Sequence, residues 1–142
     1  MSQVILYLHV LSAVLMGFYL LLPFLMLQIS LQPDEKVQHS QLGILFKMNR
    51  VGQTALAIAF LTGGYLVGKA DYPTLWWALA IILLLGIAAV SGIMGKSMRR
   101  ALNHTDRSVT NKNMGKIRSL SVAVSLLYFL VITLMLFPNI FV

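Results

Sequence analysis

The chain has no cysteine and few charged residues. The missing cysteine excludes disulfide bonds, thiolate metal sites and cysteine nucleophiles, and it leaves the redox compartment open. Charged residues make up 11% of the 142 residues, against about 25% in soluble domains, while hydrophobic residues make up 58%. A soluble protein this short cannot bury so much apolar surface. The bilayer is therefore the expected solvent, and residues 1–142 are expected to form one domain.

Acidic residues are scarce, and none of them lies within a long apolar run. The four are Asp34, Glu35, Asp71 and Asp106. Pumps and proton-coupled carriers usually place a carboxylate inside the membrane, so this class is disfavoured. The chain also lacks a P-loop, a G-x-S-x-G motif, an H-E-x-x-H motif and a pair of carboxylates suited to acid–base chemistry. We therefore assign no catalytic residue and do not expect an enzyme.

Four apolar segments are long enough to cross the hydrocarbon core, which takes a helix of about 20 residues. We expect these spans at about 4–28, 45–67, 74–95 and 120–137. Pro73 precedes the third span, where proline suits the first turn of a helix, and Pro138 follows the fourth. The sequence thus predicts an all-α, polytopic integral membrane protein built as a bundle of four transmembrane helices.

Basic residues lie mainly on one side of these spans. Lys36, Lys47 and Arg50 lie in or beside the first connection, and seven more basic residues lie in the segment 96–118, whereas only Lys69 lies on the other side. By the positive-inside rule, 96–118 is a basic cytoplasmic loop and both termini are extracytoplasmic. The net charge of +7 then indicates contact with anionic lipid headgroups. No nucleic acid is expected, because no aromatic residue is interleaved with these charges.

A polar cluster, Asn49, Arg50 and Gln53, lies at the cytoplasmic end of the second predicted span. Arg50 can extend its charged head to the membrane surface. Alternatively, Arg50 and Gln53 can hold an anionic group such as a propionate or a lipid phosphate. The residues expected to contact anions or lipid headgroups are Arg50, Gln53, Lys96, Arg99 and Arg100.

Small residues form stripes along two of the predicted spans, and membrane helices pack closely through such stripes. The second span has Gly52, Ala55, Ala59 and Gly63, and the third has Ala88, Ser91, Gly92 and Gly95. Both stripes are expected to face the interior of the bundle. On the first span, His9, Ser12, Met16 and Tyr19 share a helix face that is also expected to point inward. Pro23 continues this face and is expected to kink the helix.

His9 is an ionisable residue within a span, which makes it a candidate functional residue. It can hydrogen-bond a neighbouring helix, ligate haem or a metal, or take part in proton or quinone chemistry. His39 and His104 lie in predicted cytoplasmic segments, so a zinc site has too few ligands. Haem needs only one axial ligand from the protein. The candidate haem b site consists of His9, Ser12, Met16 and Tyr65, with His9 as the only iron ligand.

The chain resembles small four-helix membrane proteins related to the CopD copper-resistance domain, many of them bacterial. The resemblance is carried by LHVLSAVLMG, NRVGQTALAIAFLTGGYLV, LWWALAIILLLGIAAVSGIMGKSMRRA and LYFLVITLMLFPN. It covers nearly the whole chain, and it implies a multi-pass protein of the bacterial plasma membrane. The HemJ-type protoporphyrinogen oxidases share a similar plan, in which a helix-1 histidine is implicated in haem binding, and His9 occupies the matching place. That pattern also has a lysine early in helix 3, which LWWALAII lacks.

Three functions remain open at this point. The first is haem binding through His9, for redox chemistry, haem handling or sensing. The second is a non-catalytic accessory or assembly role in a larger membrane complex. The third is a small carrier or exporter, which could work as a homo-oligomer.

Overall fold

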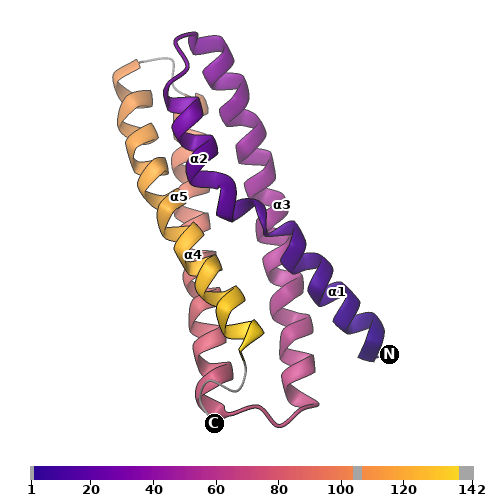
Figure 1. Cartoon of the computed structure of the whole chain (residues 1–142). Coiled ribbons are helices and arrows are strands. Elements are labelled where there is room, and N and C mark those ends of the chain that lie inside the picture. The colour runs from indigo at the N-terminus through magenta and orange to yellow at the C-terminus, as the bar shows by residue number, and fades with distance from the viewer. Residues whose placement is uncertain (1, 104–106, 138–142) are drawn as a thin grey trace.

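The computed structural model describes residues 2–103 and 107–137, which form long helices joined by short connections (Figure 1). The helices are α1 (Ser2–Leu15), α2 (Phe18–Ser30), α3 (Glu35–Gly68), α4 (Thr74–Asn103) and α5 (Arg107–Leu136). The described residues contain no strand. The prediction of an all-α protein is therefore confirmed.

Four helical segments of the described chain are long and apolar enough to cross a membrane. They are Gln3–Ser30, Glu35–Gly68, Thr74–Asn103 and Asn111–Leu136. The first segment contains both α1 and α2, and each segment overlaps one of the four predicted spans. The predicted plan of four membrane-spanning helices agrees with this arrangement.

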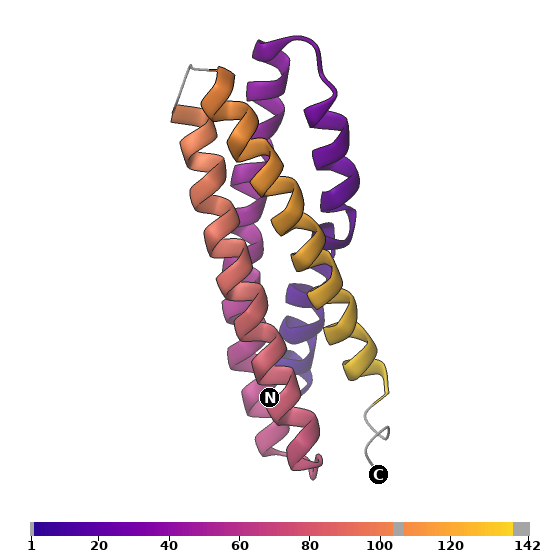
Figure 2. The same cartoon turned by 90° about the vertical axis from the view of Figure 1, so that its left-hand side faces the viewer.

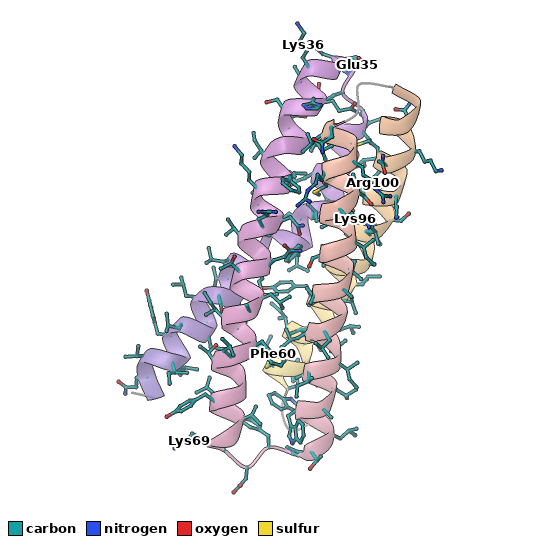
Figure 3. The ribbon with its side chains drawn as sticks, turned by 180° about the vertical axis from the view of Figure 1, so that it is seen from behind. Glu35, Lys36, Phe60, Lys69, Lys96 and Arg100 are labelled. Carbon is teal, nitrogen blue, oxygen red and sulfur yellow. The ribbon has the colours of Figure 1, made fainter. Side chains whose placement is uncertain are left out.

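The helices pack in a fixed order around the bundle (Figures 1 and 2). In the first span, α1 packs on α3 and α2 packs mainly on α5. Helix α4 packs on both α3 and α5. The start of α1, the α3–α4 connection and the end of α5 lie at one end of the bundle. The α2–α3 connection, the end of α4 and the start of α5 lie at the other, which we call the basic end because Lys36, Lys96 and Arg100 lie toward it (Figure 3).

The second membrane-crossing helix, α3, is much longer than the predicted span at 45–67. Its 34 residues extend about 51 Å at 1.5 Å per residue, whereas the hydrocarbon core is about 30 Å thick. The helix begins where the Asp34 carboxylate accepts a hydrogen bond from the Lys36 backbone N–H at 2.9 Å. The first ten residues of α3 are more polar than the predicted span at 45–67, but they are capped and helical.

The segment 96–118, expected as a connecting loop, is helical over its described residues 96–103 and 107–118. Met98 and Ala101 at the end of α4 are buried, and so are Met114 and Ile117 near the start of α5. These side chains continue the core beyond the predicted spans. A basic exterior lowers the mean hydropathy of this segment, while its apolar face still packs as a helix.

The first span is interrupted between α1 and α2 at Met16 and Gly17. The Gly17 N–H donates to the Val14 carbonyl at 2.9 Å, and the Tyr19 N–H donates to the Met16 carbonyl at 3.0 Å, so the chain tightens into three-residue turns here. Pro23 lies inside α2, where its ring and missing N–H disfavour a regular bond to Tyr19. The predicted departure from a straight helix is present, but it lies before Pro23 and coincides with Gly17.

Candidate functional site

His9 on α1 is held against α3 by its imidazole Nδ1. This atom lies 3.1 Å from the Ala59 carbonyl oxygen and 3.1 Å from Thr62 Oγ1. The approach depends on Gly63, because a Cβ atom there would lie only 3.0 Å from His9 Cε1. The predicted small stripe of α3 thus forms the surface on which the His9 ring lies.

The partners of Nδ1 determine which ring nitrogen carries the proton. A carbonyl oxygen only accepts hydrogen bonds, so Nδ1 must be the donor to Ala59. The Thr62 hydroxyl donates its own proton to the Ile58 carbonyl at 2.7 Å, which leaves Thr62 Oγ1 as a second acceptor for Nδ1–H. The contact with Ala59 therefore corresponds to the tautomer with its proton on Nδ1, which leaves the lone pair on Nε2.

The structure places the other predicted cofactor residues in different environments. Ser12 is buried beside His9, and its hydroxyl donates to the His9 backbone carbonyl at 2.8 Å. Met16 is buried in the main core. Tyr65 is exposed, and the Lys69 ammonium lies 5.6 Å from the centre of its ring. Ser12 therefore binds the backbone of the His9 turn rather than its imidazole, and Tyr65 faces outward.

His9 offers a single nitrogen to a metal. Among residues 2–103 and 107–137, no group of three histidine, aspartate or glutamate side chains is arranged to hold a metal ion. The donor set therefore matches haem, which can be ligated by one histidine, better than it matches zinc. His9 is half-buried at the α1–α3 contact.

A second buried polar cluster joins three helices nearer the basic end. Asn49 of α3 donates from Nδ2 to the Ser91 carbonyl of α4 at 3.1 Å, and its Oδ1 accepts from the Tyr19 hydroxyl of α2 at 3.0 Å. Cβ atoms at Gly95 and Gly52 would lie 2.9 Å from Asn49 Nδ2 and 2.7 Å from the Tyr19 hydroxyl. The two glycines therefore provide the space that this cluster occupies.

The sequence grouped Asn49 with Arg50 and Gln53, but the structure separates them. Asn49 is 1% exposed, Arg50 is exposed, and Gln53 is half-buried at the edge of a surface groove. Asn49 lies one turn before Gly52 on the stripe of small residues, and this spacing is the signal that could have identified it as an interior residue.

Four of the five predicted anion-binding residues are exposed on α3 and α4, namely Arg50, Lys96, Arg99 and Arg100. Arg50 of α3 and Arg99 of α4 place their guanidinium carbons 5.5 Å and 6.0 Å from the centre of the same ring, that of Phe46. Within the described part of the chain, no carboxylate pairs with either arginine. Lys96 and Arg100 are also exposed on α4 (Figure 3). Two cations from neighbouring helices therefore meet at one aromatic side chain.

The predicted inward face of α3 agrees with the structure better than that of α4. Gly52, Ala55 and Ala59 are buried on α3. On α4, Ser91 and Gly95 are buried, but Ala88 and Gly92 are exposed. The prediction that Ala88 and Gly92 face the interior is therefore wrong. The α4 stripe is wider than the face that packs inward, so its outer members lie at the surface.

Comparison of the chain with protein-family models, curated proteins and solved structures finds no match.

Proposed function

We propose that this chain is a membrane protein that binds haem b through Nε2 of His9. The observation that carries the proposal is the hydrogen bond between His9 Nδ1 and the Ala59 carbonyl. Histidines that ligate metals usually donate their other ring N–H to a carbonyl or carboxylate, which fixes the ring and raises its basicity.

The residues around His9 have distinct roles in this proposal. The Ala59 carbonyl and Thr62 Oγ1 accept from Nδ1–H and keep the Nε2 lone pair available. Gly63 lets the ring approach α3, and Ser12 binds the backbone of the same turn. Haem, when bound, supplies one-electron redox chemistry or ligand sensing. The missing helix-3 lysine argues against protoporphyrinogen oxidation, so the role is electron transfer, haem handling or sensing.

The proposal includes an orientation in the plasma membrane of a bacterium. The exposed cations Arg50, Lys96 and Arg99 lie toward the basic end, and the positive-inside rule assigns that end to the cytoplasm. Both termini then lie outside the cytoplasm. His9 belongs to α1, the half of the first span that lies away from the basic end, so in this orientation it lies in the outer part of the membrane. This position suits exchange with an extracytoplasmic electron donor or haem source.

Haem titration of the purified protein tests the proposed function. Protein produced without added haem is purified in detergent and titrated with haemin while the absorption spectrum is recorded. We expect a Soret band that saturates at one haem per chain in the wild type and in His39→Ala, and that is lost in His9→Ala. His39 is the matched control because it is exposed near the start of α3. Equal spectra for wild type and His9→Ala would rule the site out.

A second function, as an accessory subunit of a larger membrane complex, is favoured by the exposure of α1. This helix packs mainly on α3, and Tyr7, Val10 and Val14 are each more than half exposed. A partner helix could cover this face. We expect a defined partner to co-purify in mild detergent with the wild type and with Leu126→Trp, but not with Val14→Trp. Leu126 is an exposed residue of α5, at 60% against 68% for Val14. Retention of the partner by Val14→Trp would exclude α1 as the interface.

A further inference from the structure

An apolar groove of about 460 Å³ lies on the outer surface between α3 and α4. Ala57 and Phe60 of α3 line one side, and Leu85 and Ala88 of α4 line the other. Phe60 lies between the two helices in Figure 3. Gln53 is the one lining residue with a polar side chain, and it lies toward the basic end. The groove has the size of a small-molecule site but is almost wholly hydrocarbon.

The two helices continue from this groove to the pair of arginines. On α3, Arg50 lies one turn beyond Gln53, and Phe46 lies one turn beyond Arg50. On α4, Arg99 lies eleven residues, or about three turns, beyond Ala88, and it therefore lies on nearly the same helix face. Because Arg50 and Arg99 meet at Phe46, the charged site and the apolar groove form one continuous surface.

The height of the arginines matches the edge of a bilayer. Arg50 lies about 27 Å from the Gly68 end of α3 at 1.5 Å per residue, close to the roughly 30 Å thickness of the hydrocarbon core. The groove lies deeper, within the apolar part of both helices. A molecule that fits both parts needs a negative group at the membrane surface and a hydrocarbon chain that enters the core.

The arginines themselves favour an anion. Two guanidinium groups contact one ring, and no carboxylate in the described chain pairs with them. Guanidinium groups bind phosphate oxygens through paired hydrogen bonds, which makes arginine well suited to a phosphate. Both guanidinium groups contact the Phe46 ring by cation–π interaction and remain exposed, so they can bind a group at the membrane surface.

We infer that the α3–α4 surface is a binding site for one anionic phospholipid. Arg50 and Arg99 bind its phosphate, with Lys96 close by on α4, and an acyl chain fills the groove between Phe60 and Ala88. The inference does not depend on haem binding, because His9 lies on the α1–α3 contact and contributes nothing to this surface.

Native mass spectrometry of the detergent-purified chain tests the site. The probes are phosphatidylglycerol, which is anionic, and phosphatidylcholine with the same acyl chains, which is zwitterionic. We expect one phosphatidylglycerol per chain, with clear preference over phosphatidylcholine. Arg50→Gln and Arg99→Gln should each weaken phosphatidylglycerol binding about fivefold. Arg100→Gln, which removes an equal charge outside the Phe46 pair, should have a much smaller effect.

A second pair of variants tests the groove. Ala88→Phe fills the groove, whereas Ala89→Phe adds the same ring at a neighbouring exposed position of α4 that does not line it. We expect Ala88→Phe to lose the bound phosphatidylglycerol and Ala89→Phe to keep it, with equal thermal stability. Equal binding of both lipids, or equal retention by Ala88→Phe and Ala89→Phe, would overturn the inference. Dimers that dissociate in Ala88→Phe would also overturn it and would show that a second copy of the chain covers the groove.

Discussion

The imidazole of His9 on α1 lies directly on the backbone of α3 at Gly63. A Cβ atom at Gly63 would lie 3.0 Å from His9 Cε1, and Nδ1 of the same ring lies 3.1 Å from the Ala59 carbonyl one turn away. The polar contact and the close approach occur on one helix face. The position of α1 and the state of the imidazole are therefore determined together.

The contact predicts different effects for two adjacent glycines. In Gly63→Ala the new methyl group displaces the His9 ring and stretches its bonds to α3. We expect a loss of about 1–3 kcal/mol of stability, typical of overpacking. Gly64→Ala is the control, since a Cβ there meets no atom within 4 Å. Thermal unfolding in detergent, followed by circular dichroism, should show a lower midpoint for Gly63→Ala only. Equal midpoints would mean that α1 is not held through this contact.

Tyr19→Phe tests the buried Asn49 cluster. The variant removes the hydrogen bond from the Tyr19 hydroxyl to Asn49 Oδ1 and leaves that oxygen without its partner. Hydrogen bonds between membrane helices contribute about 0.6–2 kcal/mol, so we expect a loss in that range. Tyr7→Phe, at an exposed position of α1, should be neutral. Unfolding by sodium dodecyl sulfate in mixed micelles measures both differences. A neutral Tyr19→Phe would show that Asn49 does not depend on α2.

At the end of the bundle away from the basic end, the contact between α4 and α5 depends on the Trp76 indole. Trp76 is 4% exposed, and its Nε1–H donates to the Leu134 carbonyl at 2.8 Å. Trp76→Phe loses this bond and part of the packing, and we expect it to lower stability by at least about 1 kcal/mol. Trp77→Phe, at the neighbouring exposed position, should have little effect. Intrinsic fluorescence during denaturation distinguishes the two, because one tryptophan remains in each variant.

The contact of α5 with the interruption of the first span predicts that a substitution in α5 changes the exchange of amides at that interruption. The Tyr128 hydroxyl donates to the Ala13 carbonyl, whose usual partner, the Gly17 N–H, instead donates to Val14. Tyr128→Phe removes this donor. We expect amides of residues 16–20 to exchange with deuterium about threefold to tenfold faster. Tyr65→Phe, at an exposed position of α3, is the control. Unchanged exchange at residues 16–20 in Tyr128→Phe would show that α5 does not stabilise the interruption.

The four long helices follow from the apolar runs of the sequence, because the solvent sets the length of a span. Hydropathy reports where a helix is in hydrocarbon, and it does not report where the helix ends. The polar start of α3 and the helical segments at 96–103 and 107–118 therefore could not be located by it. Proline marked the first span as irregular, but the position of the break also depends on Gly17 and on Tyr128 from a distant part of the chain.

The candidate site was predicted only in part. Periodicity placed Ser12, Met16 and Tyr19 on the inward face of the first span, and all three are buried. Periodicity does not give the rotation of one helix relative to another. The partners of His9 Nδ1, the meeting of Arg50 and Arg99 at Phe46, and the outward position of Tyr65 all depend on that rotation.

The most direct measurement is chemical rescue of the proposed iron ligand. His9→Gly is purified in the presence of haemin, and its absorption spectrum is recorded before and after addition of imidazole. If His9 Nε2 is the axial ligand, His9→Gly lacks the Soret band of the wild type and regains it when imidazole occupies the space of the missing side chain. A wild type that stays colourless with haemin, or a His9→Gly spectrum that equals the wild type without imidazole, would contradict the proposed function.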